Sequence, residues 1–254
     1  MSIYGIVHLS VVPLRETSSD ASEIISQVLF GESIEVLETQ HNWIRVRCLY
    51  DDYEGWMDPK QCILGISEEE AVNALKHPVT IDAISELQSS KGLQFLSIGS
   101  SVDASGEEQR LSEEYTYQFK GNTQSANKST DLEALALKWL NTPYLWGGRS
   151  IFGIDCSGFT QVFYKILGYR LQRDAYQQAN QGLPIDFMEE AKLGDLAFFD
   201  NEAGRIIHVG IVLDNHRIIH ASGQVRIDKL DQQGIYNEEL NKYTHKLRII
   251  KRII

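Results

Sequence analysis

One amphipathic helix followed only by strand-like runs constrains the fold of this chain most. Five apolar residues recur at the i, i+3, i+4, i+7 and i+8 positions of a helix with one buried face: Phe159, Val162, Phe163, Ile166 and Leu167. Four strand-like runs follow, at residues 196–199, 209–213, 217–221 and 247–254. A shorter helix is predicted ahead of them, with Thr130 and Glu133 as its capping box. Helices first and a meander of strands afterwards indicate an α+β domain over residues 128–254.

The first 64 residues have a different period. The runs SIEVLE (33–38) and WIRVRCL (43–49) alternate between apolar and polar side chains, which predicts a small all-β barrel over residues 1–64. Residues 65–127 are less regular, with a helix start at Ser67 and Glu70 and strand-like runs at 92–98 and 115–119. We expect a second, degenerate barrel there, ending in a small polar linker at 121–128.

Charge is concentrated in the front half of the chain. The net charge is −11, and residues 1–127 carry 8 Lys/Arg against 20 Asp/Glu, a local charge of −12. Such a surface should repel nucleic acid and anionic membranes and weakly attract a cationic ligand, although solubility is the plainer interpretation. No run approaches the roughly 18 apolar residues that a membrane-spanning helix needs.

The sequence also leads to expectations about the compartment, the metal content and the oligomeric state. The start of the chain lacks a basic, apolar secretory signal, which favours the cytoplasm; a periplasmic or secreted protein numbered after processing would look the same. Three widely spaced cysteines fit neither a disulfide framework nor a zinc site. We expect a reducing compartment or at most one bridge, no metal, no cofactor and a monomer.

Cys156 carries the strongest chemical signal. It lies between a glycine-rich loop and the first turn of the amphipathic helix, where the helix dipole and free N–H groups favour a thiolate. In such settings the pKa of a cysteine can fall from about 8.5 to roughly 3.5–7.5. The same N–H groups could stabilise an oxyanion, by roughly 3–4 kcal/mol for one well-aimed donor. The alternative is an inert core thiol, against which the polar neighbours Asp155 and Ser157 count.

A nucleophilic thiol needs a base, and two of the seven histidines are candidates. His208 and His220 each lie inside a predicted strand, so pairing of the strands could bring one imidazole to the thiol and the other behind it. A hydrogen-bonded core role is the alternative for either one alone. The other histidines are expected to be solvated: His8, His41, His77, His216 and His245.

Five short motifs in the back half follow one another in order. They are P-Y-x-W-G-G (143–148), D-C-S-G-F (155–159), G-D-L-x-F-F (194–199), H-V-G (208–210) and I-H-A-S-G (219–223). With them, residues 128–254 resemble the NlpC/P60 family of papain-like cysteine peptidases. The resemblance implies a papain-like fold and a Cys–His–polar triad at Cys156, His208 and His220. The motifs LFGE (29–32), W-x-R-V-R (43–47) and Y-E-G-W (53–56) resemble bacterial SH3-like domains.

The front half and the segment Arg173–Asp174–Ala175 are similar to γ-D-glutamyl-L-diamino-acid endopeptidases of that family. This resemblance implies a murein-derived peptide with a free L-Ala-γ-D-Glu start as the substrate. Asp174 would bind the terminal ammonium, and Arg173 the glutamate α-carboxylate or a supporting residue. Ala175 departs from the hydroxyl residue expected at that position.

The resemblance also implies roles for residues around the thiol. Asp155 and Ser157 would contact the γ-D-Glu unit, and Tyr144 would lie beside the oxyanion. An acidic residue and a tyrosine of the SH3-like domain would face the L-Ala end, for which Glu23 and Tyr53 are the candidates. Two other interpretations stay open: a secreted murein hydrolase that acts on intact wall, and a non-catalytic wall-binding protein.

Overall fold

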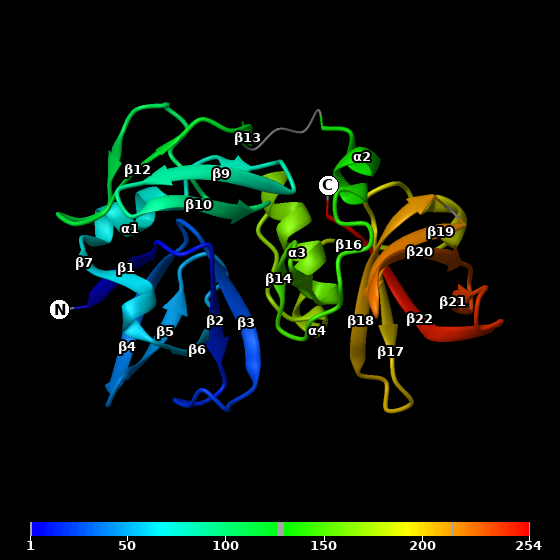
Figure 1. Ribbon diagram of the computed structural model, residues 1–254. Helices are drawn as coiled ribbons and strands as arrows, with labels where there is room; N and C mark the ends of the chain where they lie inside the picture. The colour runs from blue at the N-terminus through cyan, green and yellow to red at the C-terminus, as the bar shows by residue number, and fades with distance from the viewer. Residues whose placement is uncertain (1, 126–129, 215, 254) are drawn as a thin grey trace.

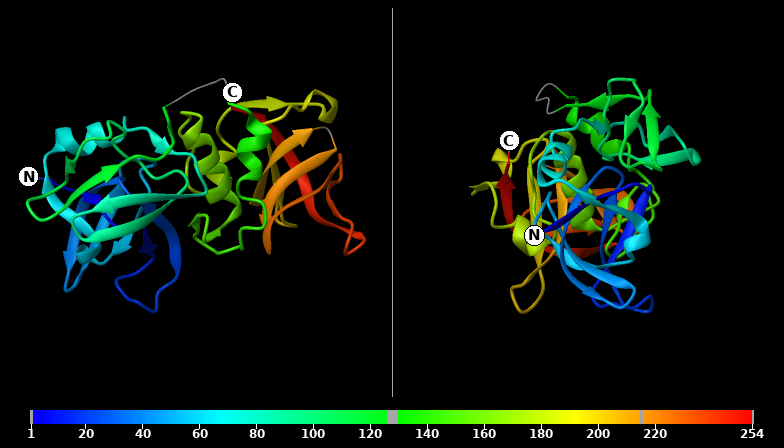
Figure 2. Two further views of the ribbon diagram at one scale, coloured as in Figure 1. Left: turned by 45° about the horizontal axis from the view of Figure 1, so that its top comes forward. Right: turned by 90° about the vertical axis from the view of Figure 1, so that its left-hand side faces the viewer.

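The computed structural model describes residues 2–125, 130–214 and 216–253 and consists of three consecutive units. The two front units lie on one side of helix α3 (Cys156–Ile166), and the large sheet of the third unit lies on the other (Figures 1 and 2). The predicted start of the third domain, at residue 128, and the end of the predicted linker lie outside the described residues. Among the residues described, no helix is both long and apolar enough to cross a membrane.

The first unit is a seven-stranded antiparallel sheet in the order β3-β2-β6-β5-β4-β1-β7. Its strands, with one 3₁₀ turn (Pro59–Gln61), are β1 (Ile3–Val7), β2 (Val11–Arg15), β3 (Ile24–Leu29), β4 (Ser33–Gln40), β5 (Trp43–Cys48), β6 (Glu54–Met57) and β7 (Cys62–Ile66). Alternation explains the fold: in β5, Ile44 and Val46 point into the core. Arg45 and Arg47 point outward and bond to Glu54 of β6.

The second unit begins with helix α1 (Glu68–Ala74), and the predicted capping box of Ser67 and Glu70 is present. A four-stranded sheet in the order β10-β9-β12-β11 follows, beside the pair β13-β8. The strands are β8 (Val79–Thr80), β9 (Ile84–Ser89), β10 (Gly92–Ser97), β11 (Gln109–Arg110), β12 (Thr116–Phe119) and β13 (Thr123–Gln124). Phe30 of the first unit packs into the core of this second sheet, so the two front units share apolar contacts.

The third unit combines short helices with a seven-stranded sheet, which confirms the α+β class. Its helices are α2 (Leu132–Leu137), α3, α4 (Ala175–Gln178) and the 3₁₀ turn Met188–Glu190. Its strands are the hairpin β14 (Arg149–Ser150) and β15 (Gly153–Ile154), then β16 (Leu183–Ile185), β17 (Leu196–Asp200), β18 (Ile206–Asp214), β19 (Arg217–Ser222), β20 (Gln224–Leu230), β21 (Gly234–Asn237) and β22 (Lys242–Arg252). Because β22 pairs with both β17 and β21, the strands from β17 to β22 close on themselves.

Helix α3 is buried on almost every side. Its apolar face packs against β18 and β19, as the spacing predicted. Its polar residues are also buried because the front units cover them; Gln161 Nε2, for example, donates to Asp51 Oδ2 at 2.8 Å. The predicted cap of α2 at Thr130 is wrong. Asp131, one residue later, accepts the Ala134 N–H instead, since its carboxylate is the stronger acceptor.

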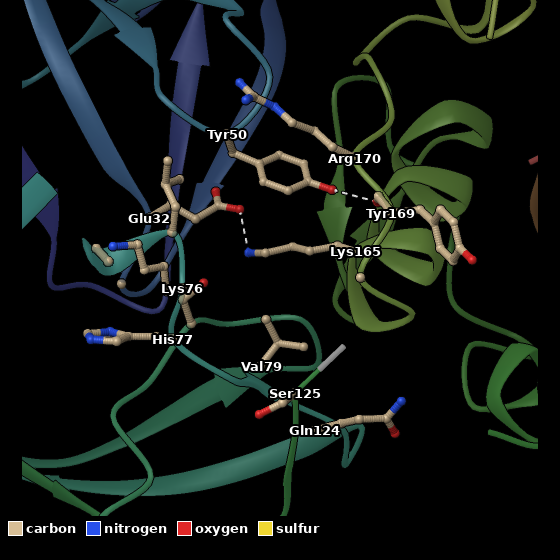
Figure 3. A pocket seen from close by; sticks show the side chains of 15 residues that line it. Glu32, Tyr50, Lys76, His77, Val79, Gln124, Ser125, Lys165, Tyr169 and Arg170 are labelled. Atoms are coloured by element: carbon tan, nitrogen blue, oxygen red, sulfur yellow. Dashed lines mark hydrogen bonds and ion pairs between the residues drawn. The ribbon is translucent and has the colours of Figure 1, made fainter. Parts of the chain in front are cut away.

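A buried ion cluster joins the first unit to the third. Glu32 is 4% exposed and accepts hydrogen bonds from Arg149 (2.8 and 2.9 Å) and Lys165 (2.8 Å). Tyr50 donates to the carbonyl of Tyr169, and a cavity of about 310 Å³ lies beside these contacts (Figure 3). Burial raises the pKa of Glu32, but Arg149 and Lys165 more than offset it and lower that pKa to about 2. The cluster holds the two units in one orientation.

Candidate active site

A cleft of about 580 Å³ lies where the first unit meets the third. The first unit contributes Glu23, Ile25 and Tyr53, and the third contributes Tyr144, Trp146, Asp155, Cys156, Ser157, Asp174, Ala175, Tyr176, Ile206 and Ile207. Glu23 directly precedes β3, and Tyr53 directly precedes β6. Seven residues that the sequence had singled out therefore meet in one cleft, although two of them are about 100 residues or more from the others along the chain.

Cys156 is the first residue of α3 and is 7% exposed. Asp155 caps the helix, and its Oδ1 accepts the Gly158 N–H at 2.7 Å. Burial, helped by the Asp155 carboxylate, raises the pKa of the Cys156 thiol to about 12, although the N–H groups of Val209 and Ser157 act in the opposite direction. The expected fall in this pKa is therefore wrong for the free enzyme, because desolvation of the thiolate outweighs the helix N-terminus.

His208 and His220 are hydrogen-bonded to each other, as strand pairing suggested. His208 Nε2 lies 2.8 Å from His220 Nδ1, and His220 Nε2 lies 3.0 Å from Asp228 Oδ2. Because Nε2 of His208 is engaged, Nδ1 is the nitrogen left for Cys156, whose sulfur accepts a hydrogen bond from the neighbouring Val209 amide. Asp228 could not be found from the sequence, since its place beside His220 depends on the register of β19 and β20.

Gly210 makes the contact between the two histidines possible. In the register of β18 and β19 it faces His220, and a Cβ at this position would lie 2.8 Å from the His220 Cβ. The bare backbone lets the imidazole of His220 lie beside that of His208. Steric room for His220 therefore explains why the H-V-G motif has a glycine at this position.

A third imidazole, that of His245, lies against the ring of His208. The ring of His245 stacks on His208 with centroids 4.2 Å apart and an interplanar angle of 25°. The expectation that His245 is solvated is wrong, because β22 closes the sheet and brings it under β17 and β18. One nitrogen from each of His208, His220 and His245 lies within 4.8 Å of the others. However, lone pairs lie in the ring planes, and two nearly parallel planes do not meet at one metal position, so this packing is a stack and not a chelate.

The protonation states follow from burial. Desolvation, with the neighbouring His220 and His245, lowers the pKa of His208 well below its usual value. Since the pKa of Cys156 is raised, the resting pair at neutral pH is a neutral thiol and a neutral imidazole. Proton transfer from Cys156 to His208 then has to accompany the attack on a substrate.

Arg173 anchors the floor of the cleft from behind. It is 1% exposed and donates to both oxygens of Asp155 (3.1 and 2.6 Å), to Ser157 Oγ (2.9 Å) and to Ser26 Oγ of the first unit (2.9 Å). Asp155 Oδ2 also accepts the Gly147 N–H at 2.9 Å. Of the two roles that the resemblance allowed for Arg173, this geometry favours the supporting one. Asp155 lines the cleft, but its carboxylate is largely engaged within the protein.

Two carboxylates from different units face the end of the cleft. Tyr53 Oη lies 3.3 and 3.4 Å from the two oxygens of Asp174, to which it donates. Glu23 Oε1 accepts from Trp146 Nε1 at 2.5 Å. Burial raises the pKa of Asp174 even though Arg173 and Tyr53 lower it. A partly desolvated carboxylate that accepts from the neutral Tyr53 hydroxyl is a suitable partner for a cation.

Tyr144 lies at the other side of the thiol. Its N–H is bonded to the Gly223 carbonyl at 3.0 Å, which ties the glycine-rich loop to β19. Burial, followed by a negative charge at Cys156, raises the pKa of Tyr144 to about 12, so its hydroxyl remains a donor. Trp146 was missed as a site residue although it lies in the P-Y-x-W-G-G motif, because nothing in the sequence shows its contact with Glu23.

Family profiles match one segment in the front half of the chain and one in the back half. Residues 141–244 match the NlpC/P60 family, and residues 14–61 match the bacterial dipeptidyl-peptidase SH3 domain. A γ-D-glutamyl-L-lysine dipeptidyl-peptidase of Bacillus subtilis (strain 168) is 33% identical over 221 residues, which cover 78% of this chain and 72% of the relative. The chain belongs to the NlpC/P60 family. It is therefore a cysteine peptidase with an SH3-like front domain.

Two further comparisons extend over almost the whole NlpC/P60 chain. Dipeptidyl-peptidase 6 of Lysinibacillus sphaericus is 25% identical, with 86% of this chain and 89% of the relative covered. The crystal structure of an NlpC/P60 family protein from Bacillus cereus ATCC 10987 superposes with a TM-score of 0.80 at 20% identity, covering 98% of this chain and 99% of the other. The latter likeness establishes the shared fold of front units and peptidase unit.

Proposed function

We propose that this NlpC/P60 peptidase hydrolyses the bond between γ-D-glutamate and an L-diamino acid in murein-derived peptides that begin with a free L-alanine, and releases L-Ala-γ-D-Glu. The observation that carries the proposal is the Asp174–Tyr53 pair at the end of the cleft that holds Cys156. The names of two relatives, γ-D-glutamyl-L-lysine dipeptidyl-peptidase and dipeptidyl-peptidase 6, support cleavage of the same bond.

Cys156 would attack the γ-carbonyl of the glutamate while His208 accepts the thiol proton at Nδ1. The helix N-terminus and the Tyr144 hydroxyl are placed to stabilise the oxyanion. Collapse of the tetrahedral intermediate breaks the C–N bond, and His208 returns its proton to the departing amine. Water, deprotonated by His208, then attacks the thioester and the C–S bond breaks. His208 returns the proton to the Cys156 sulfur, and the dipeptide carboxylate leaves.

Selectivity would come from the closed end of the cleft. A free ammonium can bind Asp174 with charge-assisted hydrogen bonds. A stem whose alanine nitrogen is acylated, as in intact wall, leaves that carboxylate desolvated and without its cation. Sites that leave a buried polar group unsatisfied in this way discriminate by about 10⁴ or more. Peptides already released from the wall, met in the cytoplasm, are therefore the proposed substrates.

Purified protein should be incubated with L-Ala-γ-D-Glu-L-Lys, with the corresponding diaminopimelate peptide and with whole sacculi, and the products identified by mass spectrometry. We expect L-Ala-γ-D-Glu from the free peptides, no solubilised sacculus, and no product from the Cys156→Ala variant. Solubilised sacculi would indicate a wall hydrolase, and no turnover of any substrate a binding protein. Turnover by Cys156→Ala would exclude the proposed nucleophile.

A further inference from the structure

Asp228 closes a hydrogen-bonded chain that leads to the thiol. Its Oδ2 lies 3.0 Å from His220 Nε2, and His220 Nδ1 lies 2.8 Å from His208 Nε2. Arg226 NH2 donates to Oδ1 of Asp228 at 3.0 Å, and Arg226 NH1 pairs with Glu239 at 3.2 Å. Both histidines and Asp228 are buried, with exposed fractions of 5%, 1% and 8%.

We propose that Asp228, oriented by Arg226, is a positioning residue that fixes the tautomers of His220 and His208 and so presents the unprotonated Nδ1 of His208 to Cys156. The proposal rests on the proposed roles of Cys156 and His208 in the reaction. It gives a function to a carboxylate two hydrogen bonds away from the base.

The assignment follows from counting donors and acceptors. An ionised carboxylate can only accept, so His220 must carry its proton on Nε2. His220 Nδ1 is then a bare acceptor, and the hydrogen bond to it requires a proton on Nε2 of His208. The remaining nitrogen, Nδ1 of His208, is therefore unprotonated and free to accept the thiol proton.

Asp228 stays ionised within this chain. Burial raises its pKa, but the hydrogen bonds from His220 and Arg226 outweigh burial and lower the pKa below its usual value. Because the three groups are buried, bulk water has little access to take the place of a missing acceptor. Arg226 holds the carboxylate in place: its NH2 donates to Oδ1 at 3.0 Å, and its Nε lies 2.8 Å from Oδ2, the oxygen that faces His220.

The Asp228→Asn variant should reverse the direction of both hydrogen bonds that link residue 228, His220 and His208. Arg226 can only donate, and its hydrogen bond goes to the Oδ1 position, whereas its Nε lies near Oδ2 without hydrogen-bond geometry. The amide oxygen should therefore take the Oδ1 position and leave the amide NH₂ facing His220. That NH₂ donates to His220 Nε2, so His220 must carry its proton on Nδ1. His220 Nδ1 then donates to His208 Nε2, so His208 must carry its own proton on Nδ1. His208 could no longer accept from Cys156. An amide in the comparable position of a serine peptidase triad lowers kcat by about 10⁴ through a wrong tautomer.

Two measurements test the tautomers, and neither needs the peptide substrate. Nitrogen NMR of labelled histidine side chains should show His208 and His220 protonated at Nε2 in the wild-type protein and at Nδ1 in Asp228→Asn. Alkylation of Cys156 by iodoacetamide should be slower in the variant by at least about tenfold, as expected when base assistance is lost. These readouts distinguish a failure of the tautomer proposal from a failure of the substrate proposal.

The double variant Arg226→Met, Asp228→Asn is the critical control. Without Arg226 the amide can turn its oxygen toward His220, so the wild-type tautomers and much of the alkylation rate should return. A double variant that is as slow as Asp228→Asn, with its tautomers unchanged from that variant, would overturn the proposal. A proton on Nδ1 of His208 in the wild-type protein would overturn it as well, even if neither variant folds.

Discussion

At the scale of single residues, the site depends on charges that are only partly solvated. Asp174 has a raised pKa because it is mostly withdrawn from water, and Tyr53 is the donor that the first unit supplies to it. Cys156 and His208 are neutral at rest for the same reason, since burial disfavours both the thiolate and the imidazolium. In the proposed reaction, substrate binding would supply a cation to the Asp174 carboxylate and trigger proton transfer at the Cys156 thiol.

Replacing Asp174 with asparagine should weaken the preference for a free amine. The neutral amide keeps the shape of the side chain but loses the charge that binds an ammonium, so kcat/KM for the free peptide should fall by ~10² or more, the scale of a charge-assisted contact of about 3 kcal/mol. The N-acetylated peptide should be affected far less. Asp186→Asn is the matched control, because Asp186 is exposed and outside the cleft. An equal loss for both peptides would exclude an ammonium partner.

The ionisation of Cys156 can be followed by the ultraviolet absorbance of its thiolate, as the difference between the wild-type protein and the Cys156→Ala variant. A thiol whose pKa is raised has little thiolate at neutral pH, so the difference absorbance should appear only as the solution becomes alkaline. A preformed thiolate–imidazolium pair would instead absorb already at neutral pH, and that result would refute the neutral resting pair.

At the scale of elements, the β18–β19 hairpin and the N-terminus of α3 position the chemistry. Backbone pairing fixes His208 and His220 on one face, and Gly210 leaves room for their contact. Helix α3 presents Cys156 to the same face and is itself held by the front units. In the proposed reaction the strands provide the base and the helix provides the nucleophile, so small shifts of either element should disturb it.

Gly210→Ala should separate the two imidazoles. The added Cβ would lie 2.8 Å from the His220 Cβ, which forces His220 away from His208. We expect kcat to fall by about 10-fold or more, as for misplaced catalytic groups, with the folded state retained. Val212→Ala in the same strand is the control: it opens a cavity in a different apolar cluster and should lower Tm without a comparable loss of kcat. Full activity of Gly210→Ala would contradict the steric role of the glycine.

Much of the site could be predicted because its residues lie in local patterns. Cys156 at a helix start and the two strand histidines follow from spacing and motif alone. Asp228, His245 and the Trp146–Glu23 contact could not be found in this way, because each depends on which distant segments pair. The register of β19 with β20 and the closure of the sheet by β22 are properties of the folded sheet and not of any sequence window.

The thiol pKa illustrates a second limit. The helix N-terminus is visible in the sequence, but the cover that the front units and the sheet place over Cys156 is not. Burial is a tertiary property, and here it outweighs the local effect. The same cover buries the polar face of α3 against Asp51 and Glu32.

At the scale of the whole molecule, the orientation of the first unit completes the cleft. Glu23 and Tyr53 reach the thiol side because contacts such as the Glu32–Arg149–Lys165 cluster and the Arg173–Ser26 bond hold the units together. The acidic front half has a possible second use, since its field would draw in a peptide with a free amine. The contacts that pack the units together therefore also form the part of the cleft that is proposed to select the substrate.

The free energy of unfolding should therefore fall in acid as Glu32 becomes protonated. Its pKa is about 2 in the folded protein against a usual 4.5, so the unfolded chain binds the proton first as pH drops. The stabilisation, on the order of 3 kcal/mol, is complete above the usual pKa and is lost as pH falls toward the folded one. Denaturant unfolding measured across that acid range should show the loss in wild type and not in Glu32→Gln.

At neutral pH, Glu32→Gln should itself be destabilised by about 3–5 kcal/mol, because two buried cations lose their counter-charge. Glu54→Gln is the matched control: Glu54 also bonds two cations, Arg45 and Arg47, but all three are partly exposed, so the cost should be about 1 kcal/mol or less. Equal costs for the two variants would mean that the buried cluster does not hold the units together.

The amine preference is tested best by the ratio of kcat/KM for L-Ala-γ-D-Glu-L-Lys to that for its N-acetylated form, measured with the wild-type enzyme. Acetylation removes one charge at the end that should meet Asp174 and changes nothing at the bond to be cut. We predict a ratio of about 10⁴ or more. A ratio near one would show that the cleft does not recognise the free amine and that the proposed substrate is wrong.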